Sequence, residues 1–78
     1  MPDLATELRH LADADRQIAE AEAHLATVEQ QHAKLASLGG ALEDSERLLA
    51  TMRDALAAFR EQRRLIELTI DDIRNGRI

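Results

Sequence analysis

The stretch Leu38-Gly39-Gly40-Ala41 lies at the midpoint of a 78-residue chain and divides it into two similar halves. The rest of the chain has few residues that interrupt a helix, namely Pro2 and one further glycine. Glycine readily adopts the left-handed backbone angles that end many helices. The stretch therefore predicts one helix over about residues 3–38, a turn at Gly39 and Gly40, and a second helix over about residues 41–75.

Large apolar residues return every seven positions in both halves. We name this position a and the position three residues later d. A spacing of 3.5 residues sustained over five heptads indicates a coiled-coil seam. The first half has Leu4, Leu11, Ile18, Leu25 and His32 at a, and Glu7, Ala14, Ala21, Val28 and Leu35 at d. The second half has Leu42, Leu49, Leu56, Arg63 and Ile70 at a, and Ser45, Met52, Phe59, Ile66 and Ile73 at d.

The short connection sets the direction of the second helix. Two helices joined by so few residues pack antiparallel, and an a residue of one helix then meets a d residue of the other. Residues whose numbers add up to 77 are paired in this register, which matches Ala21 with Leu56 and Ile18 with Phe59. The sequence predicts an all-α fold, an antiparallel two-helix coiled-coil hairpin that forms one domain over residues 1–78.

Two layers of the seam are polar. His32 is expected opposite Ser45, and Arg63 is expected to extend outward toward Asp13 or Glu67. Polar residues at seam positions lower stability but fix the register of the two helices.

The outer surface of the hairpin contains small and apolar residues that a monomer would expose. A single alanine is explained by helix propensity, but alanine follows every a position of the first helix, which favours close approach of another helix. A chain this short also buries little apolar surface by itself. We therefore predict a homodimer that forms a four-helix bundle. The self-interface candidates are Ala5, Leu8, Ala12, Ala19, Ala26, Ala33, Leu48, Leu65 and Leu68.

The composition restricts the function. The net charge of −5 disfavours nucleic acid and anionic lipid as partners, since both attract clustered basic residues. The chain lacks cysteine, and no signal peptide or membrane-spanning segment is predicted, so we expect a cytoplasmic protein. The prediction is a non-enzymatic oligomerising or adaptor module that binds a protein partner and no cofactor.

A metal-binding bundle is the first alternative function. Glu7 with His10, and Glu29 with His32, have the Glu-x-x-His spacing that places two ligands on one helix face in di-iron bundles. Such a site also needs inward-facing acids from the second helix, which has no histidine and no acid at any a or d position. His10 and His24 are too far apart along the helix to share a metal within one chain.

A nucleic-acid-associated protein is the second alternative, because Arg60, Arg63 and Arg64 form the densest basic cluster. Glu61 and Glu67 interleave with these arginines, so ion pairing within the helix is the preferred interpretation. No glycine-rich loop beside a strand, cysteine nucleophile or Ser, His and acid set indicates an enzyme.

Three segments resemble a group of short alphaproteobacterial proteins to which no activity is assigned. They are Glu46-Arg47-Leu48-Leu49-Ala50-Thr51-Met52-Arg53 with Leu56, Arg63-Arg64-Leu65-Ile66, and the run from Leu11 to Glu20. The resemblance implies a helix, a glycine turn and a second helix over most of the chain. At the turn this chain has Ala41 and Leu42 where the group tends to have a polar Asp-Thr cap.

Overall fold

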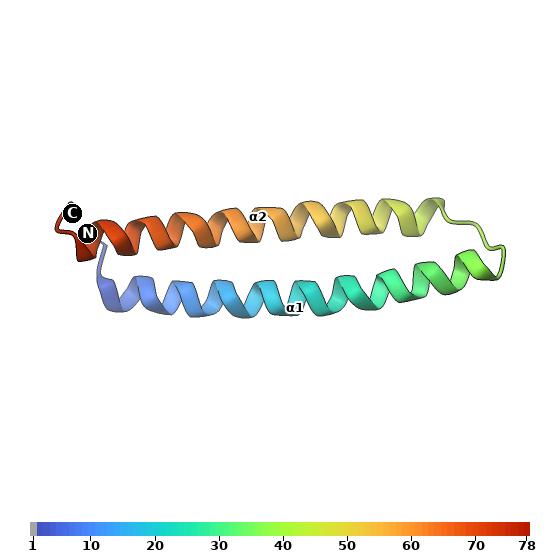
Figure 1. Cartoon of the computed structure of the whole chain (residues 1–78), viewed down its shortest axis with the longest axis horizontal. Coiled ribbons are helices and arrows are strands. Elements are labelled where there is room, and N and C mark those ends of the chain that lie inside the picture. Colours follow the sequence, from blue (N-terminus) through green and yellow to red (C-terminus); the bar gives the residue numbers. More distant parts are fainter. Residues whose placement is uncertain (1) are drawn as a thin grey trace.

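The computed structural model describes residues 2–78 and contains two long helices (Figure 1). Helix α1 covers Leu4–Ser37 and helix α2 covers Glu43–Arg74. The two helices pack against each other along a rod of 58 × 15 × 15 Å, and the described residues form no strand. The all-α prediction is therefore confirmed. The predicted domain begins at Met1, which lies outside the described residues.

The chain runs out along α1, turns and returns along α2, so both ends of the chain lie at the end of the rod opposite the turn (Figure 1). Side-chain bonds between the helices follow this order. His32 bonds to Ser45 near the turn, whereas Asp15 bonds to Arg63 farther along the rod.

Two glycines shape the turn. Gly39 has a φ of +73°, the left-handed conformation that side chains with a Cβ disfavour. The Gly39 N–H donates to the Ala36 carbonyl and the Gly40 N–H donates to the Leu35 carbonyl, which is the Schellman pattern of a helix end. A Cβ atom at Gly40 would overlap the Leu35 side chain. The turn therefore needs both glycines, each for a different reason.

The start of α2 differs from the predicted position. The helix begins at Glu43, two residues later than predicted, and the apolar Leu42 occupies the N-cap position without a side-chain cap. Glu43, Asp44 and Glu46 place negative charge in the first turn, where it is stabilised by the positive end of the helix dipole. Charge rather than a capping side chain stabilises this helix end.

The core follows the predicted seam. Every buried residue occupies an a or d position, but none is less than 2% exposed. Leu35 departs from the seam prediction, because its side chain closes over Gly40 and stays 37% exposed. A two-helix layer thus has one thin core. The buried residues are Ala14, Val28, Leu49, Leu56 and Ile70.

Candidate functional site

The seam has two edges of different chemistry. In an antiparallel pair, residues that follow the d positions flank one edge and residues that precede the a positions flank the other. The charged edge consists of Asp15, Glu22 and Glu29 of α1 and Arg53, Arg60 and Glu67 of α2. The neutral edge consists of His10, Gln17, His24 and Gln31 of α1 and Leu48, Ala55, Gln62 and Thr69 of α2.

Ion pairs connect the two helices along the charged edge. The carboxylate of Glu29 lies 3.5 Å from the Arg53 guanidinium, and that of Glu22 lies 3.8 Å from Arg60. These side chains are about half exposed, so each pair is worth only about 0.2–1 kcal/mol. A displaced register would separate the pairs, so together they favour the observed alignment.

Arg63 extends from the seam onto the charged edge and pairs with both Asp15 and Glu67. The predicted partner was Asp13 or Glu67, and the pair with Glu67 confirms the second alternative, whereas the partner on α1 is Asp15 and not Asp13. Asp13 lies on the neutral-edge side of α1, where it pairs with Arg16 at 3.6 Å. Asp15 follows the d residue Ala14 and therefore faces α2.

The other polar layer joins His32 to Ser45. The His32 Nδ1 atom lies 2.6 Å from the Ser45 hydroxyl oxygen, and that hydroxyl lies 3.0 Å from the Leu42 carbonyl oxygen. A hydroxyl has one hydrogen, so when Ser45 donates to Leu42, the Nδ1–H of His32 donates to Ser45. Both polar groups of this half-buried layer are therefore paired. Within the described residues, no buried side-chain nitrogen or oxygen lacks a hydrogen-bond partner.

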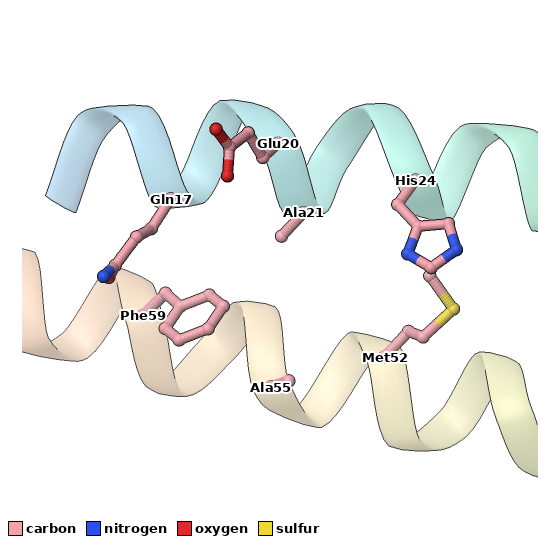
Figure 2. A pocket seen from close by; sticks show the side chains of 7 residues that line it. All are labelled: Gln17, Glu20, Ala21, His24, Met52, Ala55 and Phe59. Carbon is pink, nitrogen blue, oxygen red and sulfur yellow. The ribbon is translucent and has the colours of Figure 1, made fainter. Parts of the chain in front are cut away.

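The neutral edge is hollowed where the two helices meet. An open hollow of about 380 Å³ lies near the middle of the rod. Figure 2 shows Met52 and Phe59 extending from α2 and Gln17 and His24 extending from α1, with the short side chains of Ala21 and Ala55 between them. The remaining lining residue is Glu20.

A second hollow of about 280 Å³ lies farther along the neutral edge, between His10, Asp13 and Gln17 of α1 and Gln62 and Ile66 of α2. Within residues 2–78, no neutral-edge residue forms an ion pair across the helices. This edge of the seam is thus less covered by side chains that bridge the helices.

The self-interface candidates do not share one surface. The alanines that follow the a positions lie on the outer side of α1 beside the charged edge, and Leu8 lines a hollow of about 220 Å³ with Arg63, Glu67 and Arg74. Leu48 belongs to the neutral edge and Leu65 lies beside it, whereas Leu68 lies nearly opposite the seam. All of them are exposed: Ala5, Ala12, Ala19, Ala26, Ala33, Leu8, Leu48, Leu65 and Leu68.

The Glu-x-x-His pairs are not brought together. Glu7 lies 3.5 Å from the His10 ring, but Glu29 pairs with Arg53 of the other helix and His32 bonds to Ser45. Residues 2–78 contain no group of three or more histidines and acids placed to hold a metal ion.

The arginine cluster is paired with carboxylates. Arg64 donates two hydrogen bonds to Glu61, at 2.9 and 2.6 Å, and these bonds hold the pKa of the Glu61 carboxyl below its usual value. The Arg63 pair with Glu67 also lies within α2, as the spacing predicted. Arg60 instead reaches Glu22 of α1.

The pairing of Arg60 with Glu22, and of Arg53 with Glu29, was not predicted from the sequence, because charges across the two helices were compared only for Arg63 of the seam. The signal was present, since both members of each pair directly follow a d position. The hollows could not be predicted from heptad positions, because their size depends on the distance between the two helices.

Neither α1 nor α2 contains a stretch both long and apolar enough to cross a membrane. Comparisons of the chain with protein-family models, with curated proteins and with solved structures find no match.

Proposed function

We propose that this protein is a non-enzymatic oligomerising or adaptor module of the cytoplasm. Two hairpins, each a coiled coil, form a four-helix bundle, and the bundle binds a protein partner. The observation that carries this proposal is the incomplete burial of the hairpin. No described side chain is fully buried, and only five of the described residues, at 4–5% exposed, form the core.

The exposed area supports the same proposal. The hairpin exposes 5629 Å², whereas a folded monomer of 8.7 kDa is expected to expose about 4,700 Å². The excess of about 900 Å² is close to the area of about 800 Å² that each partner buries in a standard protein interface. A second copy of the hairpin would cover an area of this size.

Large apolar residues contribute to the excess. Leu8, Leu48, Leu65 and Leu68 lie within the helices and are 39–51% exposed. Scattered apolar residues are common on the surface of monomers. On a rod only 15 Å wide, however, these leucines occupy a large share of the surface. Kinship with the short alphaproteobacterial hairpin proteins is part of this proposal and adds no activity to it.

Light scattering over a dilution series, with thermal unfolding followed in parallel, tests the proposal. We expect a mass near twice 8.7 kDa and a melting temperature that rises with protein concentration. The double variant Leu65→Glu with Leu68→Glu should weaken the dimer. A monomer at every concentration, with a constant melting temperature, would contradict the dimer and redirect the search to a different protein that covers the hairpin.

A further inference from the structure

We infer that a second copy of this chain docks on the neutral edge, with α1 of one copy running antiparallel to α1 of the other. The inference rests on the proposed dimer and adds the face, the direction and the position of its two-fold axis. In this arrangement the two turns lie at opposite ends of the bundle, and α2 packs against α2 of the partner copy.

The chemistry of the two edges selects the face. Docking on the charged edge would remove Asp15, Glu22 and Glu29 and their arginines from water, at a desolvation cost that ion pairs often fail to recover. The eight neutral-edge residues from His10 to Gln31 and from Leu48 to Thr69 include no Asp, Glu, Lys or Arg, and the linings of the two hollows add one carboxylate each, those of Glu20 and Asp13. Burying this edge is therefore less costly.

The hollow at the middle of the neutral edge supplies a place for side chains of a second helix. Its floor is formed by the methyl groups of Ala21 and Ala55, and Met52 and Phe59 border it (Figure 2). Met52 and Phe59 are only half-buried in the hairpin. A second hairpin would cover the hollow and bury more of these two large apolar residues.

The α1 row of the neutral edge is self-complementary when it is reversed. His10, Gln17, His24 and Gln31 alternate at intervals of seven residues, so an antiparallel copy places every histidine beside a glutamine. A glutamine amide both donates and accepts, so it can bond to either nitrogen of a neutral imidazole. A parallel copy would instead place histidine beside histidine.

Two independent features of the neutral edge locate the same two-fold axis. The histidine and glutamine row is centred between Glu20 and Ala21, and the exposed leucines at 48 and 65 are centred between Leu56 and Ala57. These two centres lie at the same level of the rod in the register that pairs His32 with Ser45. An axis there brings Leu48 of one copy against Leu65 of the other.

The central hollow straddles this axis. Its lining residues on α1 begin at Gln17 and end at His24, and on α2 they begin at Met52 and end at Phe59. The hollow, the leucines and the alternating row thus coincide at one level, and all of them lie on or beside the neutral edge.

A matched pair of charged substitutions tests the face. Ala55→Arg places a charge in the hollow, and Ala57→Arg places the same charge on an exposed site of α2 away from the neutral edge. We expect Ala55→Arg to weaken the dimer at least about 10-fold in light scattering, a loss of about 1.4 kcal/mol. Ala57→Arg should leave the dimer unchanged, and circular dichroism should show equal helix content.

Disulfide trapping tests the direction without destabilising the hairpin, because the chain has no cysteine of its own. A mixture of Gln17→Cys and His24→Cys chains should form the mixed disulfide several-fold more than either homodisulfide. An equimolar mixture of Asp15→Cys and Glu22→Cys chains, on the charged edge, is the control and should trap no dimer.

The outcomes separate the inference from the proposed function. A wild-type dimer that survives Ala55→Arg but dissociates with Ala12→Arg would overturn the neutral edge and assign the alanine row as the interface. Predominant homodisulfides of Gln17→Cys would overturn the antiparallel arrangement of α1 with α1. A monomeric wild type would overturn the dimer itself.

Discussion

The charged edge and the neutral edge flank the same seam but differ in what holds the helices together. On the charged edge, carboxylates of α1 face arginines of α2 and form ion pairs across the seam. On the neutral edge, no such pair forms among the described residues, and two hollows open between the helices. One edge therefore favours the alignment of the hairpin, and the other remains available for a further contact.

The difference shows that the register of the two helices and the stability of the hairpin depend on different residues. Exposed ion pairs contribute little free energy because water competes for their charges. The buried apolar residues all lie in the seam between the two edges, although this core is only one layer thick. Four measurements can test this division.

The largest effect is expected from Leu56→Ala in the seam. Leu56 is only 5% exposed, so the substitution should lower the free energy of unfolding by about 2–5 kcal/mol. Urea unfolding at a single low protein concentration measures the change. Leu48→Ala on the neutral edge is the control, and at that concentration its effect should stay within about 0.5 kcal/mol. Equal losses from both substitutions would argue against one shared core.

The polar layer of the seam should give the next largest effect. Ser45→Ala removes the partner of the His32 Nδ1–H in a half-buried layer and should cost about 0.5–1.5 kcal/mol. The double variant His32→Leu with Ser45→Ala should be more stable than the wild type but less uniquely aligned, with additional amide peaks in a two-dimensional NMR spectrum. A double variant less stable than the wild type would show that the polar layer contributes net stability.

A smaller effect is expected on the charged edge. A double-mutant cycle on Glu22→Gln and Arg60→Gln should give a coupling of about 0.2–1 kcal/mol, which decreases with added salt. The same cycle on Gln17→Ala and Gln62→Ala of the neutral edge should give no salt-dependent coupling. A coupling that depends on salt on the neutral edge but not on the charged edge would show that ion pairing holds the helices together on the wrong edge.

The smallest effect concerns Glu61, which pairs with Arg64 within α2. The hydrogen bonds from Arg64 lower the pKa of the folded-state carboxyl, so the pair stabilises the helix above the unfolded-state pKa. This contribution is lost as the pH falls through the lowered pKa. The melting temperature of the wild type should exceed that of Glu61→Gln near neutral pH and converge with it in acid. A difference that grows in acid would contradict the sign of the shift.

The sequence predicted the seam well because burial follows the heptad pattern directly. Ala14, Val28 and Leu56 are buried at the positions that a spacing of 3.5 residues assigns to the interface. Leu35 is an exception, because its side chain packs over Gly40 in the turn. A heptad pattern does not include this local contact.

The partners of the charged residues were harder to predict than the seam. Arg63 reaches Asp15 rather than Asp13 because the direction of a side chain around the helix decides which acid it meets. Distance along the chain carries no such information. The hollow beside Phe59 depends on the separation of the helices, which single residues do not determine.

The placement of the turn also sets an order of assembly in time. The His32 and Ser45 pair closes a loop of 13 residues, whereas the Asp15 and Arg63 pair closes one of 48. The longer closure costs about 1.2 kcal/mol more chain entropy when it forms by itself. We therefore expect folding to proceed from the turn outward and opening to proceed from the far end inward. Amide hydrogens near Leu4 and Arg74 should then exchange with solvent before those near Val28 and Leu49.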